Sequence, residues 1–184
     1  ASDTPTIAKQ ILVSDQDRHV IAFGANTIGT TVQDPLLIRF STQESLVDWT
    51  PTATNTAGDL RIGSGSQFIT AVQTKREIVI WTNSSLHSMR FIGPPFTFGI
   101  APVSSQTTIA GPNAVAAVDD IVLWMGKNTF YLYDGKVQQI PCTVKEEVFF
   151  DMDFAQLDKV SAGINSEFGE VIWFYPSSSN SIAN

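Results

Sequence analysis

The alternation of apolar and polar positions predicts β-strands along almost the whole chain. Short apolar runs rich in Ile, Val, Phe and Tyr are separated by turns rich in Gly, Pro, Asn, Asp and Ser, which is the pattern of short strands joined by tight connections. The expected strands cover residues 11–13, 19–23, 36–40, 60–62, 68–72, 77–81, 86–91, 97–100, 114–118, 121–125, 129–133, 137–140, 160–164 and 170–175.

One strand pattern occurs twice and a looser copy follows. Residues 77–81 read Glu-Ile-Val-Ile-Trp and residues 120–124 read Asp-Ile-Val-Leu-Trp, and each is followed by a polar turn. Trp81, Trp124 and Trp173 recur at intervals of 43 and 49 residues. That period is typical of the four-stranded blades of a β-propeller, and large aromatic residues at one position of successive blades are expected to fill the space between stacked sheets.

We therefore expect an all-β, β-propeller-like fold, a single domain or part of one over residues 1–184, with about three to four blades of antiparallel four-stranded sheets. The last blade contains two strands, so we expect the chain to be a fragment of a longer protein. A short helix is predicted near residues 144–150, where Thr143 and Glu146 have capping-box spacing. The approximate blades are residues 7–62, 67–102, 113–142 and 159–176, the last incomplete.

Composition narrows the function classes. With 43% hydrophobic and 16% charged residues, the chain is an ordinary globular sequence, and no apolar run approaches the ~20 residues of a membrane-spanning helix. A net charge of −7 disfavours tight nucleic-acid binding but suits a surface past which DNA slides. Cys142 has no partner for an internal disulfide, and we expect it to be buried.

No residues form a recognisable chemical site. His19 and His87 lack neighbouring metal ligands, and we expect both at the surface or at strand edges. The carboxylate pairs at 119–120 and 151–153 are explained by a hairpin turn and a helix end, and residues 63–66 by a plain turn. The arginines are expected to face solvent rather than to converge on a substrate; they are Arg18, Arg39, Arg61, Arg76 and Arg90.

An enzymatic function is therefore not expected. Residues 41–49 contain the serine and tryptophan of a sialidase Asp-box but lack its aspartate and glycine, and no serine, histidine and aspartate arrangement indicates nucleophilic catalysis. We predict no catalytic, cofactor-binding or metal-binding residues and no cofactor. The long polar segment 41–59 is predicted to be a functional loop or the decorated edge of a blade.

Three segments, in order, resemble a known family. They are residues 38–51 (Ile-Arg-Phe-Ser to Asp-Trp-Thr-Pro), 77–98 (with Gly-Pro-Pro-Phe-Thr-Phe) and 124–135 (Trp-Met-Gly to Tyr-Leu-Tyr-Asp-Gly). Together they are similar to the β-propeller region of tail-hub, nozzle, tail tubular and tail-stabilisation structural proteins of tailed phages. The resemblance continues through residues 137–176 and covers about residues 11–176.

The resemblance implies a structural component of a bacteriophage tail or neck, a virion protein made in the bacterial cytoplasm. Such proteins form homo-oligomeric rings, commonly hexamers, beside portal and tail proteins. They contribute to the tube for DNA ejection without binding DNA specifically, contact no membrane and carry over no catalytic residue. Two alternatives remain open: a carbohydrate-binding or glycan-cleaving propeller used in host adsorption, and a cellular protein-binding propeller.

Overall fold

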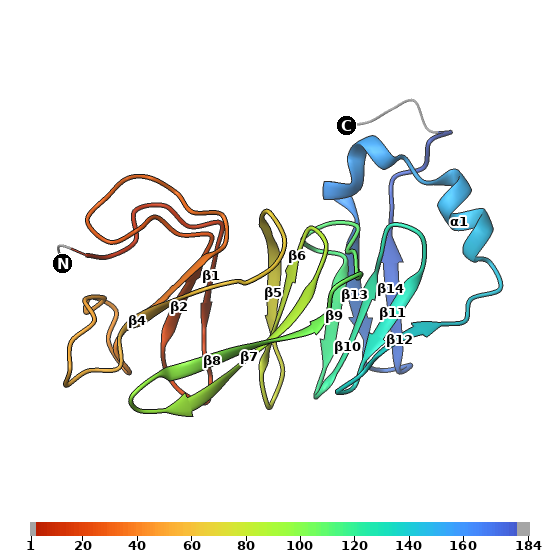
Figure 1. The fold of residues 1–184 in the computed structure, drawn as a ribbon. Coiled ribbons are helices and arrows are strands. Elements are labelled where there is room, and N and C mark those ends of the chain that lie inside the picture. Colours follow the sequence, from red (N-terminus) through yellow and green to blue (C-terminus); the bar gives the residue numbers. More distant parts are fainter. Residues whose placement is uncertain (1–2, 180–184) are drawn as a thin grey trace. The chain divides into compact units, whose positions relative to one another are not determined.

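Antiparallel β-sheet makes up most of the regular secondary structure of the computed structural model, which describes residues 3–179 (Figure 1). All the expected strands are present within these residues, with ends shifted by a few positions, as is usual where strands fray into turns. The strands are β1 (Gln10–Val13), β2 (Val20–Phe23), β3 (Leu37–Phe40), β4 (Gly58–Arg61), β5 (Phe68–Gln73), β6 (Ile78–Thr82), β7 (Leu86–Gly93), β8 (Thr97–Ser104), β9 (Val115–Val118), β10 (Ile121–Met125), β11 (Phe130–Tyr133), β12 (Val137–Ile140), β13 (Ser161–Asn165) and β14 (Glu170–Phe174).

The strands form successive meanders. Three sheets have four strands each in chain order, β1 to β4, β5 to β8 and β9 to β12, and β13 with β14 forms a two-stranded sheet. Every pairing between these strands is antiparallel, because each strand runs back beside the one before it in its sheet. The expected all-β fold of four-stranded antiparallel sheets is confirmed.

The chain divides into two compact units, Ala1–Gln106 and Thr107–Asn184. The first unit contains the β1–β4 and β5–β8 sheets. The second contains the β9–β12 sheet, the β13–β14 hairpin and two short helices, α1 (Lys145–Asp151) and the 3-10 helix η1 (Phe154–Lys159).

The core of the first unit lies between its two sheets. Buried aliphatic and aromatic side chains from both sheets form one cluster, in which the rings of Phe23 and Phe68 stack with centroids 5.0 Å apart. Gln10 on β1 adds polar contacts, because its amide oxygen accepts the Ala71 N–H at 2.9 Å and its amide nitrogen donates to the Ala71 carbonyl at 2.7 Å. The first strands of the two sheets are thus joined by hydrogen bonds as well as by apolar burial.

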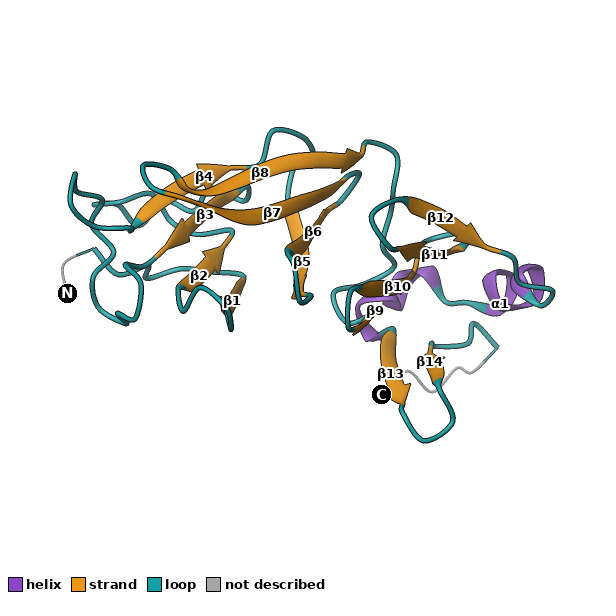
Figure 2. Cartoon of the chain, turned by 90° about the horizontal axis from the view of Figure 1, so that it is seen from below, coloured by secondary structure: helices purple, strands orange, loops and turns teal. Residues whose placement is uncertain are grey.

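Two segments add further contacts to the first sheet, and one of them, the β7–β8 hairpin, also contributes Met89 and Phe98 to this core. Residues 41–59 fold back so that Trp49 packs on Ala22 and Ala25, on the other face of the first sheet. The hairpin of β7 and β8 extends across toward β3 and β4 (Figures 1 and 2), where Thr97 Oγ1 donates to the Thr56 carbonyl at 3.1 Å. The long polar segment is therefore a packed loop rather than a free one.

Aromatic stacking organises the second unit. Trp124 on β10 is fully buried and stacks on Tyr131 with centroids 5.2 Å apart. The ring of Trp173 lies 5.2 Å from that of Phe130, and its indole donates to the Ala114 carbonyl at 3.0 Å. The expected core role is confirmed for Trp81 and Trp124, which are both fully buried, whereas Trp173 is half-buried.

Two local expectations were wrong, and one short helix was not predicted. The helix begins at Lys145 and has Val144 as its N-cap with no side-chain hydrogen bond, so the predicted capping box does not form. The helix that the sequence did not predict, η1, is capped by Asp153, which accepts the Ala155 N–H at 2.9 Å. Cys142 is half-exposed, because it lies in the connection after the edge strand β12 rather than in a strand that faces the core.

Candidate functional site

The structure places both histidines inside the first unit, which corrects the expectation that they lie at the surface. His19 is 0% exposed and His87 is 3% exposed. Sequence reasoning missed this because the groups that cover them come from distant loops and strands. Each histidine is a candidate centre for chemistry, so the contacts of each decide what it does.

His87 lies in a cluster of hydroxyl groups. Its Nε2 is 3.0 Å from Ser85 Oγ and 3.1 Å from Ser64 Oγ, and Ser85 Oγ is 2.6 Å from Thr82 Oγ1. Burial lowers the pKa of His87, so the ring is neutral near pH 7 and able to accept from a serine. A serine beside a histidine is the beginning of a nucleophilic site.

The other features of a nucleophilic site are missing around His87 within residues 3–179. Among the described residues, the hydrogen bonds of the His87 ring are to Ser85 and Ser64, so no acidic group among them orients the imidazole as a triad requires. Ser85 is itself buried. The cluster instead ties the turn at 63–66 to the hairpin between β6 and β7, and it is a structural hydrogen-bond network that no spacing in the sequence signals.

His19 lies among aromatic rings. Its ring centroid is 5.1 Å from that of Phe98, 5.9 Å from Phe91 and 6.5 Å from Phe40. Its Nε2 is 3.1 Å from Thr56 Oγ1, and its Nδ1 makes no hydrogen bond of good geometry among residues 3–179. Burial lowers the pKa of His19, and the carbonyl and carboxylate of Asp17 partly oppose this shift.

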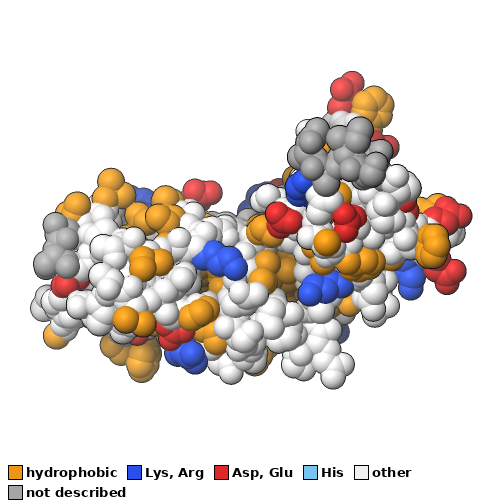
Figure 3. Space-filling model, turned by 90° about the horizontal axis from the view of Figure 1, so that it is seen from above, with side chains coloured by type: hydrophobic (Ala, Val, Ile, Leu, Met, Phe, Trp, Pro, Cys, Tyr) orange, Lys and Arg blue, Asp and Glu red, His pale blue; other side chains and the backbone are white. Residues whose placement is uncertain are grey.

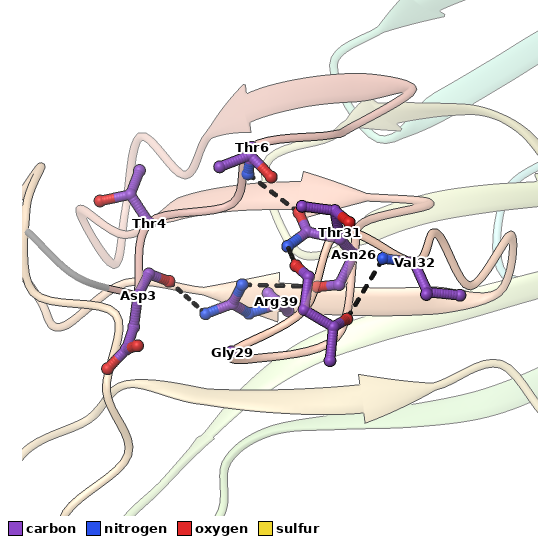
Figure 4. A pocket seen from close by; sticks show the side chains of 9 residues that line it. Asp3, Thr4, Thr6, Asn26, Gly29, Thr31, Val32 and Arg39 are labelled. Carbon is purple, nitrogen blue, oxygen red and sulfur yellow. Dashed lines mark hydrogen bonds between the residues drawn. The ribbon is translucent and has the colours of Figure 1, made fainter.

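Arg39 is buried as well, at 1% exposure, which corrects the expectation that the arginines face solvent. Its terminal nitrogens donate to the main-chain carbonyls of Asp3 and Asn26, the latter at 3.4 Å (Figure 4). Burial lowers the pKa of Arg39, and the carboxylates of Asp3 and Asp59 oppose the shift. The guanidinium of Arg39, on β3, therefore holds two segments in place: the N-terminal segment that contains Asp3 and the loop after β2 that contains Asn26.

A pocket of about 500 Å³ opens beside Arg39. Its walls carry several threonine hydroxyls (Figure 4), and its lining residues include Asp3, Thr4, Thr6, Thr30, Thr31 and Val32. The Nε of Arg39 has no hydrogen-bond partner among the described residues but is shielded from solvent. The pocket is thus a polar surface hollow in which threonine hydroxyl groups, rather than the Arg39 Nε, are exposed.

The carboxylate pairs have structural roles. Asp119 lies in the turn between β9 and β10 with a positive φ of 55°, and Asp151 at the end of α1 accepts from Ser177 Oγ at 2.7 Å. Hydrogen bonds from Gln156 and from the Ala155 N–H lower the pKa of Asp153. Among residues 3–179, no group of three or more His, Cys, Asp or Glu side chains has the arrangement of a metal site.

Exposed apolar side chains mark candidate contact surfaces. The tip of the β7–β8 hairpin exposes Phe91, Ile92 and Phe96, and the 41–59 loop exposes Leu46 and Val47. On the face that Figure 3 shows, Lys and Arg side chains lie scattered rather than gathered in a patch. None of the described helices is long and apolar enough to cross a membrane.

Comparison with models of known protein families, and with curated proteins, gave no match.

Proposed function

We propose that the chain is a structural, non-enzymatic part of a bacteriophage tail or neck, in a hub or nozzle whose subunits form a homo-oligomeric ring. In this proposal the meanders are blades of a β-propeller, and the assembled ring contributes to the tube through which DNA leaves the virion. Neighbouring tail and portal proteins are its partners, and DNA passes without specific binding.

The observation that supports the propeller interpretation is the contact between first strands of consecutive sheets. In the first unit, Lys9 Nζ and Gln10 contact Phe68 and Ala71, and Asp15 N donates to Gln73 Oε1 further along. These contacts advance along both strands in one direction, so β1 and β5 run parallel. Propeller blades place their first strands around a common axis in this way.

The same arrangement recurs in the second unit. Asn113, just before β9, forms a parallel bridge to Ser161 at the start of β13, and its carbonyl accepts the Ala162 N–H at 2.8 Å. Since two separate pairs of sheets meet through their first strands, the stacking is a repeated feature of the chain. A repeat of this kind suits a scaffold whose sheets stack on one another.

Surface properties support an assembly role. The apolar hairpin tip at Phe91, Ile92 and Phe96 is the kind of surface that subunit contacts bury. The net charge of −7 and the scattered cations (Figure 3) give phosphate groups little to bind. Such a surface lets DNA slide past.

Cryo-EM of the purified protein tests the proposal. We expect particles with ring symmetry and a lumen, and Ile92→Ser with Phe96→Ser is expected to shift the particles toward monomers. Phe168→Ser, which changes an exposed phenylalanine in the turn between β13 and β14, is the matched control. A protein that stays monomeric at high concentration refutes the ring.

The threonine-lined pocket favours a second candidate, a carbohydrate-binding or glycan-cleaving propeller that acts in host adsorption. The hydroxyl groups that line the pocket match the polar surface of a saccharide. The pocket volume of about 500 Å³ lies in the size range of small-molecule sites. Incubation with host surface polysaccharide, followed by assay of newly released reducing ends, separates the candidates. Turnover that Thr31→Ala reduces favours the second and refutes a purely structural role.

A further inference from the structure

We propose that His19, Phe40, Thr56, Phe91 and Phe98, here called the His19 cluster, form a pH-sensitive contact: protonation of His19 releases the β7–β8 hairpin and the 41–59 loop from the first sheet. This device is independent of the proposed function. It lies entirely in the first unit, and it involves the same hairpin that carries the exposed apolar tip.

The hydrogen bonds around Thr56 connect the three elements. Thr56 Oγ1 accepts the Gln43 N–H at 2.9 Å, so its own proton is available to the His19 Nε2, 3.1 Å away. The Thr56 carbonyl accepts from Thr97 Oγ1 at 3.1 Å. One residue therefore joins the histidine to both arms of the loop and to the start of β8.

In this proposal the neutral ring accepts the Thr56 hydroxyl proton at Nε2, so its own proton is on Nδ1. Protonation then adds an N–H at Nε2, which can no longer accept from Thr56. The Thr56 hydroxyl proton must then find another acceptor. The His19 Nε2, which accepted from Thr56 in the neutral ring, becomes a donor in the protonated ring.

The surroundings of the ring oppose a positive charge. The ring is fully buried, with Phe98 and Phe40 in edge-on arrangements and Phe91 tilted, and burial of a charge without full pairing is costly. Opening the hairpin and the loop returns the imidazolium to water. Acid therefore favours the open arrangement, because the open form binds the proton more tightly.

The charged groups around the cluster do not supply a counter-ion to the buried ring. Asp17, in the turn before β2, is the one that raises the pKa of His19, and its effect is smaller than that of burial. On the other packed elements, Glu44 pairs with Arg18 and Arg90 pairs with Glu77. Asp48 accepts from Thr42 and Asn55, and Arg39 donates to carbonyls from the buried position described above.

Hydrogen exchange of the full 184-residue chain tests the proposal at about pH 7.5 and about pH 5, on either side of the ordinary histidine pKa. After correction for the chemical exchange rate, we expect protection of residues 41–59 and 91–98 to fall several-fold at the lower pH, while protection of β5 and β6 falls by much less. His19→Gln is expected to abolish the pH dependence, and Thr56→Val to weaken it in the loop.

His87→Gln is the matched control, since His87 is also buried but is not a member of the cluster, and it is expected to leave the local effect in place. Equal pH dependence in His19→Gln and wild type overturns the proposal, as does a parallel loss of protection in β5 and β6, which would indicate global acid unfolding. If His19→Gln does not fold, NMR of the wild-type chain decides: the ring signals of Phe91 and Phe98 must change with the same midpoint as the His19 signal, and separate midpoints overturn the proposal.

Discussion

Replacement of Trp124 tests whether the repeated tryptophan is the centre of the second unit. Trp124→Ala removes a fully buried indole that stacks on Tyr131, and truncations of this kind cost about 3–5 kcal/mol through lost burial and the cavity left behind. Trp124→Phe keeps an aromatic ring but loses the bond from Nε1 to the Thr108 carbonyl, 3.1 Å long. The unsatisfied carbonyl makes this smaller change cost about 1–3 kcal/mol.

Urea denaturation followed by circular dichroism is the appropriate assay, because fluorescence changes when a tryptophan is removed. Hydrogen exchange in β9 to β12 reports whether the loss is local. Phe150→Ala, at a side chain that is 91% exposed at the end of α1, is the control and is expected to change stability by less than about 0.5 kcal/mol. A loss below about 1 kcal/mol for Trp124→Ala, or equal losses for Ala and Phe, would refute the reasoning.

Three further changes probe the first unit. Gly65 has a φ of +94° and a Cβ there would lie 2.6 Å from Thr82 Cβ, so Gly65→Ala is expected to lower the unfolding free energy by about 1–3 kcal/mol; Gly63→Ala, where the added Cβ meets open space, is expected to change it by less than about 0.5 kcal/mol, and equal effects in denaturation would contradict the steric argument. Gln10→Ala leaves an amide and a carbonyl of β5 without their partners, and a thermal scan is expected to show a loss of about 1–3 kcal/mol; no loss would mean that water replaces both bonds. Burial lowers the pKa of His87 below 6.5, so the unfolded chain binds the proton more readily and stability falls as pH drops below 6.5 toward the folded-state pKa; denaturation at a series of pH values is expected to show a shallower dependence in His87→Gln, and an unchanged slope would exclude His87 as a source.

Local pattern was sufficient to place the strands. The alternation in residues 10–13, and the apolar runs that end at Trp81 and Trp124, each become strands. This works because strand formation depends on side chains that lie on alternate faces and on turn residues nearby in sequence, both of which are visible in a short window. The meander order of β5 to β8 and of β9 to β12 follows as well, since short connections favour pairing of each strand with its predecessor.

The sequence by itself determined the strands, the turns and the aromatic residues of the core. Tertiary structure decided which polar side chains are enclosed: His19 is covered by rings from β3, β7 and β8, His87 by the turn that contains Ser64, and Arg39 by carbonyls of Asp3 and Asn26. Burial of a polar group depends on contacts between segments far apart in the chain, and no local periodicity records them. The strands were therefore predictable from sequence, whereas the buried histidines and arginine on which the candidate sites depend were not.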